Sequence, residues 1–67
     1  MCLAIPGKIV KLEGKKALID YFGEKKEADL LCSAKVDDFV LVQQGMAIKK
    51  FNKKEAQKIL KIWREIL

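Results

Sequence analysis

The hydrophobic pattern of this chain changes its period once, at Asn52. Before that point, apolar residues alternate with polar ones in short runs separated by glycine, a pattern typical of strands that turn tightly into one another. After it, apolar residues recur every three to four positions, as on one side of a helix. The pattern predicts one C-terminal helix and five strands, at residues 8–12, 17–22, 26–30, 39–43 and 46–51.

Turn residues separate the expected strands. Glu13-Gly14-Lys15 and Gly23-Glu24 have the composition of tight turns, and Gly45 interrupts the last two runs. Within residues 17–22, the two-residue period places Ala17, Ile19 and Tyr21 on one face, which we expect to point inward. Residues 31–36 are the least regular part of the chain.

The C-terminal segment has the signals of a helix start. Asn52 is a suitable cap, Glu55 completes a capping-box pattern, and Phe51 could pack against Ala56. A stripe of apolar residues at helical spacing follows and must be buried: Ala56, Ile59, Leu60, Trp63, Ile66 and Leu67. We expect it to pack on the open end or flank of a small β-barrel formed by the strands. Residues 1–67 are thus one domain, with a barrel and N-terminal arm over 1–51 and an amphipathic helix over 52–67.

Size and composition limit the function classes. With 67 residues, the chain is too short for a doubly wound dinucleotide domain or a (β/α)₈ barrel, although 51% hydrophobic residues suffice for a small core. The absence of histidine excludes histidine bases and imidazole metal ligands, and two cysteines are too few for a disulfide scaffold or a closed zinc site. We see no signal peptide, and the longest uncharged run, residues 39–48, is too short to span a membrane. We therefore expect a soluble cytoplasmic protein with reduced thiols.

The positive charge is concentrated in one segment. Residues 1–48 contain seven lysines and seven acidic residues, whereas residues 49–67 contain seven cationic and two acidic residues and so carry the whole net charge of +5. Such a segment can bind nucleic acid, dock on an acidic protein or simply face solvent. The sequence leaves these three interpretations open.

Cys2 is the residue best suited to bind a metal or to react. If Met1 is removed, a free α-amine lies beside the thiol, and a neighbouring ammonium favours the thiolate that binds metal. One thiolate is a ligand but not a complete site, so any metal, such as low-valent iron, would be shared with another molecule. Cys32, between Leu31 and Ser33, is better interpreted as a buried apolar filler.

Residues 2–7 form a short apolar arm before the first strand. Pro6 restricts the backbone and Gly7 permits a sharp bend, so together they could hold Cys2 away from the barrel. Leu3, Ala4 and Ile5 would then offer apolar contact to a partner, although an ordinary loop would have the same composition.

Two segments resemble a known family. The opening M-C-L-A-I-P-G-K-I-V is similar to the start of the HypC/HupF hydrogenase maturation chaperones. The segment V-D-D-F-V-L-V-Q-Q-G-M-A-I, residues 36–48, resembles that family's second signature, V-G-D-Y-V-L-V-H-A-G-F-A-I. The resemblance extends over the full chain.

The resemblance implies a small five-stranded OB-like β-barrel with a C-terminal α-helix, and a chaperone rather than an enzyme. Family members help to assemble the iron centre of [NiFe] hydrogenases. They pair with the HypD maturation protein, on which the Fe(CN)2CO unit is built, and with the immature large subunit that receives it. The family's key thiol falls on Cys2, which implies a transient iron ligand and a contact to both partners.

Three positions depart from the family pattern. Gln43 stands where the family usually has histidine, and an amide can form hydrogen bonds but cannot replace imidazole as a ligand or base. Asp37 replaces glycine, so it must adopt an ordinary turn conformation or tolerate a left-handed one, and Met46 replaces an aromatic residue.

Two other functions compete with this interpretation. Small basic OB-like barrels often bind single-stranded nucleic acid, but that activity needs aromatic platforms on the strands, and here Tyr21 is expected inside and Trp63 in the helix stripe. A thiol redox protein would need Cys2 and Cys32 to meet, since there is no C-x-x-C pair. We expect neither nucleic-acid nor membrane binding.

Overall fold

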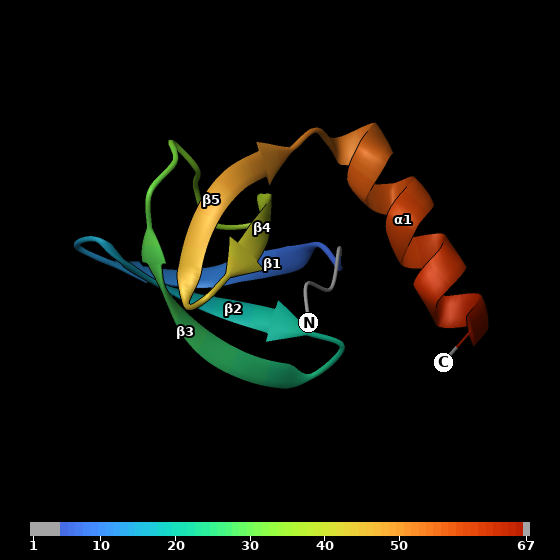
Figure 1. The fold of residues 1–67 in the computed structure, drawn as a ribbon, viewed down its shortest axis with the longest axis horizontal. Coiled ribbons are helices and arrows are strands. Elements are labelled where there is room, and N and C mark those ends of the chain that lie inside the picture. The colour runs from blue at the N-terminus through green and yellow to red at the C-terminus, as the bar shows by residue number, and fades with distance from the viewer. Residues whose placement is uncertain (1–4, 67) are drawn as a thin grey trace.

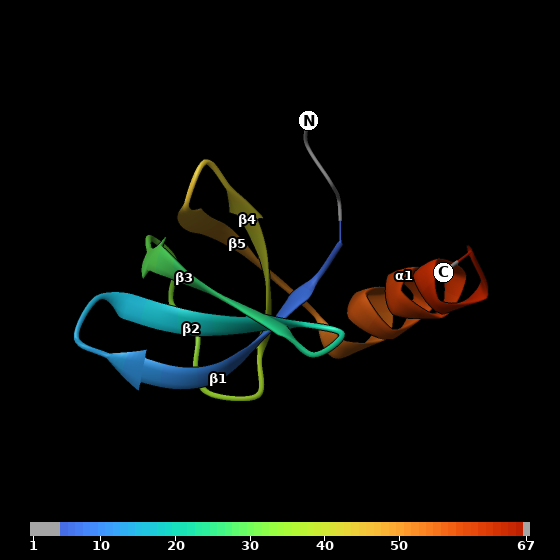
Figure 2. The same ribbon diagram turned by 90° about the horizontal axis from the view of Figure 1, so that it is seen from below.

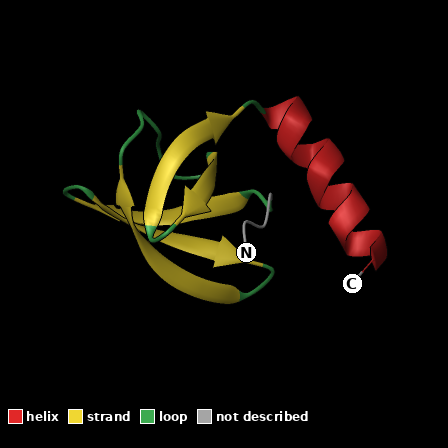
Figure 3. Ribbon diagram, viewed as in Figure 1, coloured by secondary structure: helices red, strands yellow, loops and turns green. Residues whose placement is uncertain are grey.

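A computed structural model describes residues 5–66 of the chain, with five strands and one helix in that range. Figures 1 and 3 show the order of the elements along the chain: β1 (Gly7–Glu13), β2 (Lys16–Tyr21), β3 (Glu24–Leu30), β4 (Phe39–Gln43), β5 (Met46–Phe51) and α1 (Lys53–Ile66). The predicted strand number is confirmed, and β4 and β5 have the predicted bounds. The predicted mainly-β fold with a C-terminal helix is therefore correct.

The strands form a closed barrel in the order β1-β2-β3-β5-β4. All neighbours are antiparallel except β3 and β5, which pair in parallel only at Asp29 with Met46 and at Leu30 with Ala47. This short pairing closes the barrel and protects strand edges that would otherwise be open to other chains. It leaves the first part of β3 without a neighbour on that side, where β3 curves away from β5 (Figure 1).

The core is a small cluster inside the barrel, to which every strand contributes: Ile9, Ala17, Ile19, Ala28, Val40 and Ala47. Ala17 and Ile19 are buried as the two-residue period predicted, and Tyr21 packs against the cluster while half-buried. Three of the six core residues are alanines, which allows opposite walls of so small a barrel to approach closely.

The second turn lies one residue earlier than predicted. Tyr21 pairs with Glu24, so the turn consists of Phe22 and Gly23, both with positive φ. The prediction that Phe22 belongs to the strand, and Glu24 to the turn, is therefore wrong. A two-residue turn with two positive φ angles matches the right-handed twist of the flanking strands, and this geometry prevailed over the strand preference of phenylalanine.

The predicted helix start is confirmed by its hydrogen bonds. The backbone N–H of Glu55 donates to Asn52 Oδ1 at 2.8 Å, and the backbone N–H of Ala56 donates to the Asn52 carbonyl at 3.0 Å. Phe51 and Ala56, on either side of this cap, are both buried. The side chain of Asn52 thus satisfies one of the amides that a helix leaves unpaired at its first turn.

The apolar stripe of α1 is only partly buried. Ala56 and Leu60 are buried and Ile59 and Trp63 are half-buried, but Ile66 is 69% exposed, and Leu67 lies outside the described residues. The expectation that the whole stripe packs on the barrel is wrong at Ile66. The reason is visible in Figures 1 and 2: α1 leaves the end of β5 and lies beside the barrel, without folding back across it. No helix among residues 5–66 is long and apolar enough to cross a membrane.

Asp37 adopts the left-handed of the two predicted conformations, with φ of 78°. We expect Asp37→Gly to leave the free energy of unfolding unchanged or to raise it by up to about 1 kcal/mol, because glycine has no Cβ penalty there. Asp37→Val should lower it by about 1–2 kcal/mol, since a β-branched residue tolerates this region poorly. Urea unfolding measures both variants, and a valine variant as stable as the wild type would contradict the assignment.

Candidate functional site

The base of the N-terminal arm is packed into the barrel. Pro6 is fully buried, and Gly7 is buried at the start of β1, where it pairs with Val40 of β4. Ile5 is half-buried. The other predicted site residues of the arm, Cys2, Leu3 and Ala4, lie outside the described residues. Pro6 and Gly7 therefore anchor the arm to the barrel and offer little surface of their own.

Gly7 is required for close packing. It lies within β1 and is not among the glycines with positive φ, so its backbone conformation does not itself require glycine. A Cβ at this position would collide with the Ile19 side chain and would lie 2.9 Å from the Tyr21 ring. Ile19 is fully buried in the core cluster. The sequence predicts the bend, but the need for a missing side chain became visible only once β1 and β2 were placed side by side.

The second signature segment forms a hairpin. Its loop leads into β4, Gln44 and Gly45 form a two-residue turn with positive φ at both positions, and β5 returns. Gln43 ends β4, pairs with Met46 across the hairpin and is half-buried. Gln43 is thus held in the sheet next to the turn, at the position where the family pattern has histidine.

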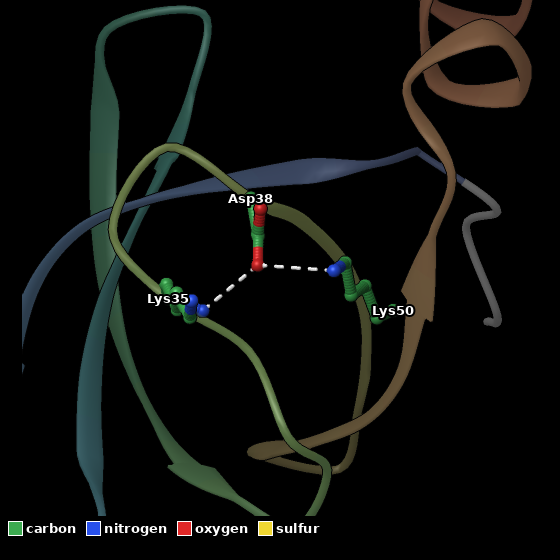
Figure 4. Close-up of polar contacts among 3 residues, drawn as sticks. All are labelled: Lys35, Asp38 and Lys50. Atoms are coloured by element: carbon green, nitrogen blue, oxygen red, sulfur yellow. Dashed lines mark hydrogen bonds and ion pairs between the residues drawn. The ribbon is translucent and has the colours of Figure 1, made fainter.

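Asp38 connects the loop before β4 to β5 through its side chain, a contact that the sequence did not predict. Its Oδ2 accepts a hydrogen bond from the backbone N–H of Lys35 at 2.9 Å and lies 3.5 Å from Lys50 Nζ (Figure 4). The side chain is only 19% exposed. Asp38 therefore fixes the loop before β4 and links it to β5.

These contacts make the stability of the fold depend on pH in the acidic range. The hydrogen bond from the Lys35 amide, aided by the positive charge of Lys50, lowers the pKa of Asp38 below its usual value. A carboxyl with a lowered pKa stabilises the fold above its unfolded pKa of about 3.9, and this contribution disappears as the pH falls through the folded value. We expect the Tm of Asp38→Asn to lie below that of the wild type at neutral pH, and the gap to narrow as the pH falls through the lowered pKa of Asp38. A gap of constant size down to pH 2 would show that the charge of Asp38 is not involved.

A pocket of about 580 Å³ brings the two signature segments together. Ile5 of the arm and Val42 and Gly45 of the second segment line it, at sequence positions almost 40 residues apart. The remaining lining comes from β2, β3 and the turn between them: Ile19, Tyr21, Phe22, Glu24, Lys26, Glu27 and Ala28. The pocket lies beside the part of β3 that has no β5 neighbour, and its wall is apolar with charged residues from β3.

Tyr21 contributes a polar group to this pocket. Burial raises the pKa of its phenol, so the hydroxyl stays protonated at neutral pH. A neutral phenol can donate one hydrogen bond and accept others. The pocket lining thus combines apolar side chains with one residue that carries a neutral hydroxyl and with the charged residues of β3.

Metal-binding groups are sparse in the described part of the chain. Residues 5–66 contain no cluster of three or more carboxylate or thiol side chains placed to hold a metal ion. Cys32 is unpaired, half-buried and packed against the core, and burial together with the charge of Asp38 raises the pKa of its thiol. A protonated thiol is a poor ligand, and this environment agrees with the filler role predicted for Cys32.

Comparison with known proteins connects these segments to one family. The model of the HupF/HypC family matches residues 1–63. The chain is 36% identical to the hydrogenase maturation factor HypC of Cupriavidus necator, over 98% of this chain and 77% of that protein. It is 37% identical to the factor of the same name from Helicobacter hepaticus, over 100% and 83% of the two chains. For the Escherichia coli K12 factor the identity is 31%, over 90% and 76%.

Proposed function

Since this chain belongs to the HupF/HypC family of hydrogenase maturation factors, we propose that it binds the HypD maturation protein and the immature large subunit of a [NiFe] hydrogenase. In this role it helps to deliver the Fe(CN)2CO unit from the first partner to the second. Its relatives are named as maturation factors and not as enzymes, and this chain likewise acts by binding. The proposed setting is the cytoplasm, where thiols stay reduced.

One observation carries the proposal: the two segments that resemble the family's signatures line the same pocket. Ile5 follows Cys2 by three residues, so covalent geometry limits their Cα separation to about 11 Å. A group held by the Cys2 thiolate can thus lie close to the pocket lined by Ile5, Val42 and Gly45. This supports a single site built from both segments.

Each residue of the arm has a distinct role in this proposal. Cys2 supplies one thiolate to the iron, and the partner supplies the other protein ligands. Leu3, Ala4 and Ile5 contact the partner through apolar side chains, and buried Pro6 and Gly7 fix the point from which the arm departs. Gln43 would act by hydrogen bonding and not as an iron ligand.

Co-purification from the native host, followed by mass spectrometry of the intact complex, tests the proposal. The expected result is a complex that contains HypD or the large-subunit precursor, bound iron, and a chain from which Met1 has been removed. The control is an unrelated tagged protein of similar size and net charge. Recovery of neither partner above that control would overturn the proposal.

A further inference from the structure

The second half of α1 carries an apolar strip that the barrel does not cover. Ile59, Ile62 and Ile66 are spaced by three and four residues and so lie along one side of the helix. Ile62 is 58% exposed and Ile66 is 69% exposed. At about 100° per residue, Ile62 and Ile66 lie on a side about a quarter turn or more from Ala56, and Ile59, which is half-buried, lies at the edge between the two sides. We name these three residues the isoleucine strip.

One border of the isoleucine strip is positively charged. Lys54, Lys58 and Lys61 lie on the neighbouring side of the helix by the same 100° spacing, and all three are exposed. Within residues 5–66, every ion pair joins side chains of the barrel or its loops, and none involves a cation of α1. Glu65 lies on the same side as these lysines, so this side carries three positive charges and one negative charge. The helix thus presents exposed aliphatic groups beside a net positive charge.

The charge decides what can cover this surface. A symmetric contact between two copies would place the same patch of both chains together and would bring like charges close. Nucleic acid offers phosphates to the lysines but no apolar groove for the isoleucines. A protein surface with an apolar groove bordered by acidic residues can accept the isoleucines and pair with the lysines.

We propose that the isoleucine strip, with Lys54, Lys58 and Lys61, is a docking surface for an acidic, apolar groove on a partner protein. This is the helix-in-groove mode, in which residues at i, i+3 and i+7 serve as anchors. The surface lies on α1, which contributes no residue to the pocket lined by Ile5, so it gives the chain a second point of attachment. Two attachment points on one partner raise the effective concentration of the arm at its own site.

The helix itself gains from such a contact. Isolated helices of up to about 15 residues are marginal in water, and most of their stability in proteins comes from packing. α1 has 14 residues and buries only Ala56 and Leu60 among them. Packing of the isoleucine strip against a partner would therefore stabilise its second half.

The charge test uses two triple variants with the same change in net charge. Lys54→Glu, Lys58→Glu and Lys61→Glu together reverse the border of the strip, and Lys11→Glu, Lys15→Glu and Lys25→Glu reverse three exposed lysines on the barrel. The probes are purified HypD and purified large-subunit precursor, a choice that rests on the proposed function. For at least one probe, the helix variant should associate about tenfold or more slowly at low salt, and the barrel variant should not. The difference should shrink at high salt.

The apolar test uses Ile62→Ser with Ile66→Ser, and compares it with Leu31→Ser, whose side chain is 61% exposed on the barrel. All three side chains are exposed, so the variants should remain folded. We expect the Kd for the same probe to rise about tenfold or more in the double variant and to change little in the Leu31 control.

The outcomes separate this inference from the proposed function. If the wild type binds the probes but the helix variants bind as tightly as their controls, the docking surface is refuted and the proposed function stands. If the wild type binds neither probe, the proposed function fails first. Salt-dependent binding to a single-stranded oligonucleotide that is lost on charge reversal, but unchanged in Ile62→Ser with Ile66→Ser, would assign the basic border to nucleic acid and overturn the inference.

Discussion

Cys2→Ser is expected to abolish the capture of the large-subunit precursor and to remove iron from the complex with HypD. Serine has nearly the same shape as cysteine, but its hydroxyl stays protonated at neutral pH and is a poor ligand for low-valent iron. No group of three or more carboxylates or thiols in residues 5–66 is placed to hold a metal ion. The loss should therefore be near complete, and iron analysis with pull-down of the precursor measures both effects.

The matched control is Cys32→Ser, which changes the same atom in the only other cysteine. Cys32 is half-buried against the core and its thiol has a raised pKa, so it should contribute packing and not ligation. Both iron content and precursor capture should stay close to the wild type, with a small fall in Tm because a polar hydroxyl replaces a half-buried thiol. Equal loss in the two variants, or loss in neither, would refute the assignment of the two thiols.

Local sequence patterns predicted the strands and the helix. The contacts that were not predicted join residues that are distant in the sequence. Glycine turns and the two-residue period predicted β4 and β5 to the residue, and the Asn52 cap predicted the start of α1. The parallel pairing of β3 with β5 and the link from Asp38 to Lys50 were not predicted. Both join segments whose contact depends on how the barrel closes, and periodicity carries no information on closure.

In the candidate site, too, the local motifs were predicted and the contacts between distant residues were not. Family resemblance pointed to Cys2 and to the segment around Gln43, because short motifs are local in sequence. The pocket was missed, since Ile5, Tyr21 and Val42 are brought together only by the closed barrel. The isoleucine strip was missed for a different reason. The predicted stripe contained Ile59 and Ile66 but not Ile62, and helical spacing does not show which residues the barrel fails to cover, as at Ile66.

The largest effect on stability is expected at Gly7. Gly7→Val should lower the free energy of unfolding by about 3 kcal/mol or more, and Gly7→Ala by about 2 kcal/mol, because any Cβ collides with the buried Ile19 side chain and crowds the Tyr21 ring. Domains have roughly 0.05–0.15 kcal/mol of stability per residue, which gives roughly 3–10 kcal/mol for 67 residues, so the valine substitution should remove about a third or more of the total stability. Urea unfolding followed by circular dichroism measures the loss.

Gly14→Ala is the control that separates collision from backbone strain. Gly14 has φ of 58° and nothing within 4 Å of an added Cβ, so its substitution should cost about 1 kcal/mol through conformation alone.

A double-mutant cycle then tests the collision itself. Ile19→Leu removes the branched methyl that approaches Gly7, so Gly7→Ala combined with Ile19→Leu should be less destabilised than the sum of the two single variants by about 1 kcal/mol. Strict additivity would mean that the branched methyl of Ile19 is not the group that limits the space at Gly7. Because Gly7 is also the point where the arm meets the barrel, positive coupling would show that the packing of β1 on β2 fixes the base of the arm, from which Cys2 reaches a partner in the proposed function.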